Sequence, residues 1–220
     1  MTSNDLEFFR LCFRLGFVRS PFLEIGSAKV QGSTPNLCEV ARSLGITDAV
    51  GTDISAGPGV DFTCDFSAPA EEFRSQWARG KFSSVAIFNV LEHTFDPVGV
   101  LTNALSCVQP GGHLVVVAPA VWPLHNFPGD FVRLLPNWFE EFARRTHTAL
   151  VDDAFCWLSQ FGVVPVRSSP DYQLPSYLGA RQSHTARYFV SRIVHRAFNT
   201  YGRSHAFTHA AIGAVMCKDD

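Results

Sequence analysis

The feature that most constrains the fold is a series of short apolar runs that each end in acidic residues. The first run covers residues 22–25, contains Glu24 and is followed by a turn at Gly26. The second run ends near Asp53 and the third near Asp65. In a sheet of parallel strands these carboxylates lie along the edge at which open α/β folds bind ligands. Such an edge suits a ligand rich in donors, such as an ammonium group, a ribose diol or an exocyclic amine.

Expected strands and helices alternate over the first half of the chain. Prolines start the expected helices, glycines follow them, and the apolar run at 82–89 suits a parallel strand covered on both faces. Thr34 is the expected N-cap of the first of these helices, with Pro35 at its first position. This alternation predicts a doubly wound, mostly parallel sheet with helices on both faces. The expected strands are 22–25, 49–54, 60–66, 82–89 and 113–118, and the expected helices are 35–44, 69–78 and 97–108.

The rhythm changes after residue 118. A loop rich in proline and aromatic residues runs over 119–136, and helices and two late strands are expected beyond it. We expect one domain over 1–220, with a helix or lid in 1–20, a ligand-binding core in 22–118, and a substrate-side elaboration in 119–220. The later elements are helices at 137–145, 151–160 and near 185–198, and strands at 163–166 and 210–217.

Composition excludes several classes of protein. The chain has 220 residues, of which 46% are hydrophobic and 17% charged, so it is a folded globular protein. Its net charge of −2 gives no overall basic footprint for nucleic acid. The six cysteines contain no CxxC pair, which indicates thiols in a reducing, cytoplasmic compartment. The histidines show no metal-binding spacing such as HExxH, so no metal is expected.

The apolar segment 6–18 raises the question of a membrane span. Glu7, Arg10 and Arg14 interrupt it, and it is too short to cross a bilayer. Acidic Asp5 precedes it, unlike the basic start of a signal peptide. We therefore expect a helix packed on the domain, with a mobile lid or a partner-facing helix as the alternatives.

Several motifs in order resemble the Rossmann-like methyltransferases that use S-adenosylmethionine. The resemblance covers roughly residues 22–133 and implies a seven-stranded sheet whose last strand, 210–217, runs antiparallel beside strand 163–166. The fragments 57–61 and 122–125, with Asp130 and Arg133, look like a small-molecule subgroup of that family. The motifs that carry the resemblance are residues 23–27, 51–54, 64–66, 89–93 and 105–116.

The resemblance implies roles for residues around the cofactor. Glu24 would orient the glycine loop near the ammonium, Asp53 would accept both ribose hydroxyls, and Ile54 would pack on the adenine. Asp65 would accept from the adenine amino group, although Asp61 competes for that role two residues earlier. Ala28 stands where the family usually has a second glycine. The expected cofactor-binding residues are Glu24, Gly26, Ser27, Asp53, Ile54, Asp65, Phe66, Asn89, Leu91 and His93.

The loop after the strand at 113–118 is expected to cover the transferred methyl group. His125 is the candidate general base, because imidazole accepts a proton near neutral pH. Asp130 would orient His125 or hold the substrate, and Arg133 would hold a substrate carboxylate or pair with Asp130. Trp122, Phe127 and Phe131 would enclose the acceptor or pack in the core. His125 favours O-methylation over N-methylation of a small-molecule acceptor.

Three other functions stay open at this point. An NAD-dependent oxidoreductase also places an acidic residue where Asp53 stands, but the run after Gly26 lacks two of the three glycines of the GxGxxG fingerprint. A non-catalytic binding protein on the same fold is the second. Methylation of nucleic acid is the third, for which the C-terminal basic stretch is formed by Arg181, Arg187, Arg192, Arg196 and Arg203.

Overall fold

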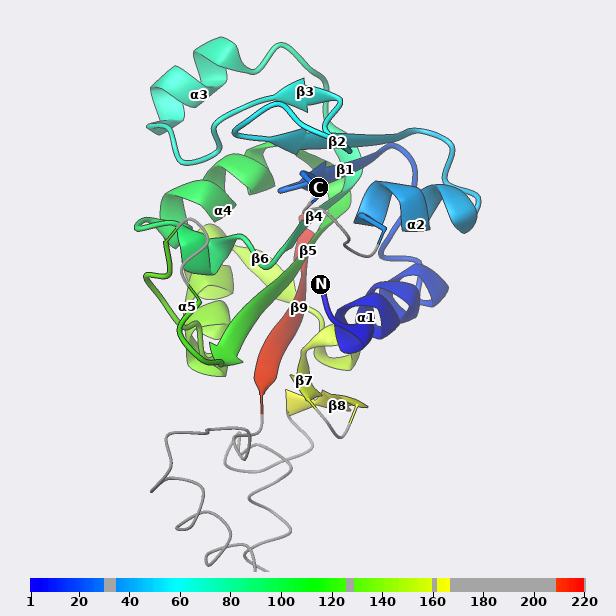
Figure 1. The fold of residues 1–220 in the computed structure, drawn as a ribbon, viewed down its shortest axis with the longest axis vertical. Helices are drawn as coiled ribbons and strands as arrows, with labels where there is room; N and C mark the ends of the chain where they lie inside the picture. The colour runs from blue at the N-terminus through cyan, green and yellow to red at the C-terminus, as the bar shows by residue number, and fades with distance from the viewer. Residues whose placement is uncertain (30–34, 126–128, 160–161, 167–208, 220) are drawn as a thin grey trace, which may run out of the picture.

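The computed structural model describes residues 1–29, 35–125, 129–159, 162–166 and 209–219. A central sheet has α1 and α2 on one face and α3, α4 and α5 on the other (Figure 1). The helices are α1 (Ser3–Arg14), α2 (Leu37–Ser43), α3 (Ala70–Gln76), α4 (Pro97–Ser106) and α5 (Pro136–Thr146), with 3-10 turns at Leu91–His93 and Asp152–Ala154. The strands are β1 (Phe22–Ile25), β2 (Ala49–Asp53), β3 (Phe62–Thr63), β4 (Phe82–Phe88), β5 (Val108–Val121), β6 (Thr148–Leu150), β7 (Cys156–Ser159), β8 (Gly162–Pro165) and β9 (Ala210–Lys218).

The strand order confirms the predicted α/β class. The described strands form one sheet in the order β3-β2-β1-β4-β5-β9-β7-β8, and β6 pairs with β9 beside this path. The first five strands of this order are parallel to one another, whereas β9 is antiparallel to β5. The carboxyl ends of β1, β2, β4 and β5 therefore meet at one edge, which we call the carboxyl edge. This is the edge at which the sequence predicts ligand binding.

The C-terminal half of the sheet differs from the expectation in two respects. The described residues form nine strands and not seven, and the neighbour of the last strand is β7 and not the strand expected at 163–166. That strand, β8, pairs with β7 as the outer half of a hairpin. Both β6 and β7 pair with β9, so two short strands stand where one longer strand is expected.

The helix predicted over 151–160 is also wrong, because residues 156–159 form β7. Trp157 packs in the hydrophobic cluster on one face of the sheet, while Cys156 and Leu158 pack in the cluster on the other. A strand that is buried on both faces reads as a continuous apolar run, which hides its two-residue period. The helix expected near 185–198 lies outside the described residues.

The N-terminus of α2 begins later than predicted. Asn36 is the N-cap, and it forms a capping box with Glu39. Asn36 accepts a hydrogen bond from the Glu39 backbone, so a side chain satisfies an N–H that the helix itself leaves open. Pro35 consequently precedes the helix, and Thr34 lies outside the described residues.

Helix α1 packs on the sheet, which confirms the helix predicted for residues 6–18. Phe8 and Phe9 are fully buried and contact the ring of Phe88 in β4. Arg10 and Arg14 face solvent. No helix among the described residues is long and apolar enough to cross a membrane.

Candidate functional site

The glycine turn after β1 brings two strand ends of the carboxyl edge into close contact. Gly26 has a φ of 82°, in the left-handed region that favours glycine. A Cβ atom built on Gly26 would lie 2.2 Å from Cγ2 of Val90, which follows β4. Only glycine therefore fits this turn as it stands.

Glu24 faces the start of α2. Its side chain is buried and accepts hydrogen bonds from the backbone nitrogens of Leu37 and Cys38, at 2.9 and 2.8 Å. Burial raises the pKa of Glu24 to about 7, although the two backbone donors act in the opposite direction. Its contacts are those of a helix-capping acceptor, which fixes the glycine loop between β1 and α2.

Asp53 ends β2 and reaches towards the glycine loop. It accepts a hydrogen bond from the backbone nitrogen of Ala28 at 3.1 Å. Ile54, the next residue, is 66% exposed. The structure thus pairs a carboxylate with an open apolar surface at the end of β2.

The two competing aspartates of the third strand have different partners. Asp61 accepts from the backbone nitrogen of Gly51 at 2.7 Å and lies 3.7 Å from the guanidinium of Arg42. Asp65 binds the backbone and hydroxyl of Ser67, at 2.8 and 2.6 Å. Asp61 therefore binds the backbone of β2, while Asp65 lies beyond the end of β3.

Besides Glu24, three more of the residues expected at the cofactor are buried in the protein. Phe66 packs against Phe73 and Trp77, and Leu91 is fully buried in the same cluster. Ser27 is also fully buried. The structure places these side chains inside the domain, so any contact they make with a ligand passes through backbone atoms or needs a rearrangement.

Asn89 joins the end of β4 to helix α1. It has a φ of 54°, and its Nδ2 donates to Oδ2 of Asp5 at 3.0 Å. Asp5 is buried and belongs to the capping box of α1. Asp5 is not among the site residues predicted from sequence, although Thr2 and Asp5 have the spacing of a capping box.

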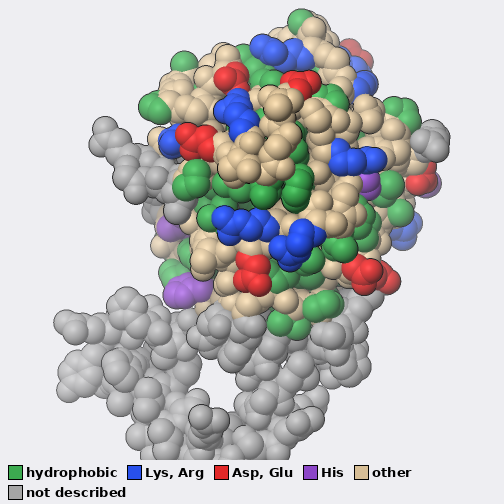
Figure 2. Space-filling model, turned by 90° about the vertical axis from the view of Figure 1, so that its right-hand side faces the viewer, with side chains coloured by type: hydrophobic (Ala, Val, Ile, Leu, Met, Phe, Trp, Pro, Cys, Tyr) green, Lys and Arg blue, Asp and Glu red, His purple; other side chains and the backbone are tan. Residues whose placement is uncertain are grey.

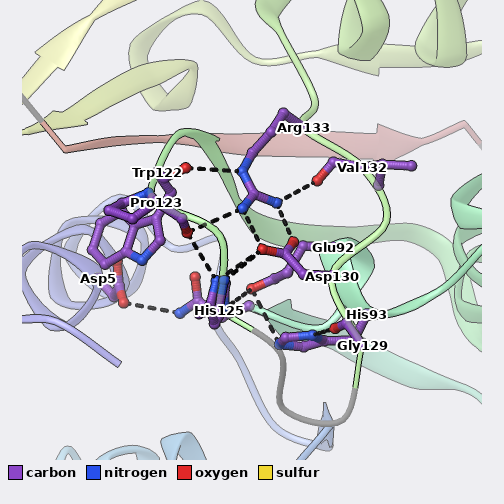
Figure 3. Close-up of polar contacts among 11 residues, drawn as sticks. Asp5, Glu92, His93, Trp122, Pro123, His125, Gly129, Asp130, Val132 and Arg133 are labelled. Carbon is purple, nitrogen blue, oxygen red and sulfur yellow. Dashed lines mark hydrogen bonds and ion pairs between the residues drawn. The ribbon is translucent and has the colours of Figure 1, made fainter. Parts of the chain in front are cut away.

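A second group of side chains lies where β4 and β5 leave the sheet (Figure 3). Glu92 is 1% exposed, and its Oε1 lies 3.7 Å from Nε2 of His93 and 3.8 Å from Nε2 of His125. Burial raises the pKa of Glu92 above its ordinary value, and the nearby imidazoles and Arg133 oppose that shift. Glu92 is not among the site residues predicted from sequence, because the sequence around it does not reveal that His125 approaches it from the loop after β5.

Asp130 holds His125 and Arg133 in one arrangement. Its carboxylate accepts from the His125 backbone nitrogen at 2.9 Å and lies 3.2 Å from Nδ1 of the same residue. Both terminal nitrogens of Arg133 donate to Asp130, which holds the pKa of that carboxyl well below its usual range. Arg133 also donates to the carbonyls of Trp122 and Pro123, at 3.5 and 3.3 Å. Asp130 and Arg133 therefore link the end of this loop to its start at residues 122–125.

Aromatic side chains around this loop are partly open. Phe131 is 57% exposed and contacts Phe95, which is 87% exposed, in an edge-to-face arrangement. Trp122 packs against His209 with ring centres 4.8 Å apart. Phe127 lies outside the described residues. Phe131 and Phe95 thus offer apolar surface at the loop that carries Asp130, whereas Trp122 packs against the protein.

Comparison by sequence identifies no relatives: no protein-family model and no curated protein matches the chain. Comparison by structure does. An S-adenosylmethionine-dependent methyltransferase from Archaeoglobus fulgidus is 15% identical, with a TM-score of 0.55 over 98% of this chain and 95% of that one.

Two further structures resemble the chain to a similar degree. The 1,6-didemethyltoxoflavin-N1-methyltransferase of Burkholderia thailandensis, solved with its substrate and S-adenosylhomocysteine, is 12% identical, with a TM-score of 0.56 over 99% of this chain and 79% of that one. The cyclase SpnF is 17% identical, with a TM-score of 0.53 over 98% of this chain and 81% of that one. The chain therefore has the Rossmann-like fold of the S-adenosylmethionine-dependent methyltransferases.

Proposed function

We propose that this protein is an S-adenosylmethionine-dependent methyltransferase that acts on a hydroxyl group of a small-molecule acceptor. The observation that supports it best is the layout of the carboxyl edge. Asp53 and exposed Ile54 stand at the end of β2, and His125 with Asp130 stands after β5. The proposed cofactor site and the proposed acceptor site therefore lie at the same edge of the sheet.

The residues at the end of β2 fit the cofactor chemically. The carboxylate of Asp53 has acceptor capacity beyond its bond to Ala28, as two ribose hydroxyls require. Ile54 offers an apolar face for an adenine ring, and Asp65 offers an acceptor for its amino group. The tight turn at Gly26 lets the backbone approach a ligand closely. When bound, S-adenosylmethionine supplies the methyl carbon, whose bond to sulfur breaks as its bond to the acceptor atom forms, leaving S-adenosylhomocysteine.

The acceptor side is the loop that Asp130 and Arg133 close. Asp130 accepts from the backbone of His125 and faces its Nδ1, so it fixes both the position and the orientation of the imidazole. His125 is the proposed acceptor of the hydroxyl proton, and its side chain is 37% exposed. Phe131 and Phe95 supply apolar surface for the body of the acceptor. Holding the acceptor in line is the main task of the protein in such a displacement.

A second candidate function is binding of the cofactor without methyl transfer. SpnF, a structure with the same fold, is named a [4+2]-cyclase, so the fold by itself does not establish methyl transfer. For nucleic acid as the acceptor we find no matching support. Charges of both signs are interspersed on the face that α1 and α2 cover (Figure 2), and the arginines of the C-terminal stretch lie outside the described residues.

Calorimetry on cofactor-free protein tests the proposal. We expect S-adenosylhomocysteine to bind with a dissociation constant in the micromolar range, about 8 kcal/mol of binding free energy. NAD serves as the competing ligand. Binding of NAD without a response to S-adenosylhomocysteine contradicts the proposal. Cofactor binding together with failure to methylate any member of a broad panel of hydroxyl and amine acceptors favours the second function.

A further inference from the structure

Glu92 is a buried carboxylate, and its nearest cationic partners lie beyond hydrogen-bond distance. Among the described residues neither of its oxygens has a hydrogen-bond partner, and its side chain is 1% exposed. Burying a carboxylate costs several kcal/mol unless it is paired or coordinates a metal.

Two imidazoles present the same nitrogen to Glu92. The Nε2 atoms of His93 and His125 lie 3.7 and 3.8 Å from Oε1, and the two rings meet nearly at a right angle, with centres 5.1 Å apart. Ligand atoms of all three residues lie within 4.8 Å of one another. The distances to Oε1 exceed those of ordinary hydrogen bonds, so the three groups surround a point rather than bonding to one another.

The other nitrogen of each ring fixes its tautomer. His93 Nδ1 contacts the carbonyl of Gly129, which only accepts, so this nitrogen carries the hydrogen. His125 Nδ1 lies 3.2 Å from the carboxylate of Asp130 and 3.4 Å from the carbonyl of Pro123, which are also acceptors. In the neutral form both rings therefore turn a lone pair on Nε2 towards Glu92.

We propose that Glu92, His93 and His125 bind a divalent transition-metal ion of the zinc type. Two neutral imidazoles and one carboxylate are a three-residue ligand set found in catalytic zinc sites, and such sites keep a fourth position open. A tetrahedral zinc ion with bonds of about 2.0–2.2 Å places its ligands roughly 3.3–3.6 Å apart. The distances from Oε1 to the two nitrogens shorten by a few tenths of an ångström to reach that range, and the longest separation, which is within 4.8 Å, shortens by up to about 1 Å as the two imidazoles approach each other.

The neighbours of these ligands fit the same assignment. Metal-bound histidines usually donate their second N–H to a carboxylate or a backbone carbonyl, and Asp130 and Gly129 supply one of each. Both terminal nitrogens of Arg133 donate to Asp130 and hold it beside His125. Sequence spacing does not reveal the site, because Glu92 and His93 are adjacent in the chain while His125 reaches them only through the fold.

The open position gives the site a ligand class, and this step rests on the proposed function. One carboxylate leaves a bound divalent ion with a net positive charge, which attracts an oxygen ligand that loses its proton readily. The hydroxyl of the acceptor is such a ligand: bound at the open position, it would release its proton to solvent water, and the resulting oxyanion would attack the methyl carbon. In that case His125 would be a ligand of the ion, in place of its role as proton acceptor.

Metal binding to the full chain tests the site without any measurement of methyl transfer. Protein freed of metal by a chelator is titrated with Zn²⁺ by calorimetry and with Co²⁺ by visible absorption, which reports four-coordinate nitrogen and oxygen ligands. We expect one equivalent to bind. Glu92→Gln and His125→Asn should each weaken that binding by about 100-fold or more, and Asp130→Asn by about 10- to 100-fold.

The matched control is His147→Asn. His147 is exposed at the end of α5 and has a φ of 53°, which asparagine tolerates. This variant should bind as the parent does. His93→Asn gives a second test if Glu92→Gln fails to fold, as judged by circular dichroism. Absence of binding by the folded parent, or equal binding by parent and ligand variants, overturns the site. S-adenosylhomocysteine binding to the same samples is measured separately, so failure of the metal site and failure of the proposed function are distinguishable.

Discussion

Asp5 in the first turn of α1 accepts a hydrogen bond from the side chain of Asn89 at the end of β4, with 3.0 Å between Oδ2 and Nδ2. The same Oδ2 accepts from the backbone nitrogen of Thr2 at 2.6 Å. Asn89 directly precedes the turn that carries Glu92 and His93. The N-terminal helix therefore holds the backbone from which part of the candidate site is built, over and above its contribution to the core.

Asp5→Ala should destabilise the protein and loosen this link. The change removes the partner of a part-buried amide and one half of a capping box, for a loss of about 2–3 kcal/mol in the free energy of unfolding. Urea unfolding measures it. Glu7→Ala, on the exposed side of the same helix, is the control and should change stability by less than about 0.5 kcal/mol. Equal effects of the two changes would show that the contact with Asn89 contributes nothing.

Asp53→Ala should weaken cofactor binding severely. It removes the proposed acceptor of two ribose hydroxyls, and we expect a loss of about 2–4 kcal/mol in binding free energy, since hydrogen bonds to charged groups contribute about 1.5–3 kcal/mol each. Calorimetry with S-adenosylhomocysteine is the measurement. Asp48→Ala is the matched control, because Asp48 is an exposed aspartate that precedes β2 at its opposite end. Unchanged affinity in a folded Asp53 variant contradicts the assignment of β2.

The cofactor half of the molecule was largely predictable from sequence. Local signals, such as the apolar runs that end at Glu24, Asp53 and Asp65 and the turn at Gly26, predict where the parallel strands lie in the sequence. The contacts of individual side chains were less predictable. Glu24 caps α2 and Phe66 enters the core because of packing partners that lie far away in sequence.

Local sequence patterns do not predict the late strands or the group of Glu92, His93 and His125. β7 carries apolar residues on both faces, so its pattern does not distinguish a strand from a helix. The group of Glu92, His93 and His125 exists only because β4 and β5 are neighbours, and because Asp130 draws the loop after β5 back towards the turn after β4. Long-range pairing of this kind leaves no spacing motif in the chain.

The stability of the protein should fall as the pH rises from about 4.5 to about 7. Burial raises the pKa of Glu24 from 4.5 to about 7, so the folded state binds a proton more tightly than the unfolded state does. The stabilising contribution is fully present below pH 4.5 and is lost as the pH passes about 7, an effect of about 3 kcal/mol. Glu24→Gln should flatten this part of the pH profile of unfolding, whereas Glu7→Gln, on the surface of α1, should keep it. A parental slope in the Glu24 variant assigns the effect to another group.

Gly26→Ala should impair both folding and cofactor binding. The new Cβ would lie 2.2 Å from Val90 Cγ2, and the φ of 82° disfavours any side chain. Adding Val90→Ala removes the clash but not the backbone strain, so the double variant should recover part of the stability and not all of it. Thermal unfolding and calorimetry follow the two effects. Full recovery in the double variant would show that the steric contact alone requires glycine here.

His125→Ala should spare cofactor binding and depress turnover. His125 lies after β5 beside Glu92 and Asp130, while the proposed ribose acceptor stands at the end of β2. Loss of a positioned proton acceptor typically lowers a rate by about 10²–10⁴-fold, and loss of a metal ligand removes activation of the acceptor by another route. His147→Ala is the control, since His147 is exposed at the end of α5.

Once an acceptor is found, steady-state rates and S-adenosylhomocysteine affinity are compared for the three proteins. An unchanged rate for His125→Ala would leave positioning as the main catalytic contribution and favour an amine acceptor. A loss of cofactor affinity would instead place His125 on the cofactor side of the site.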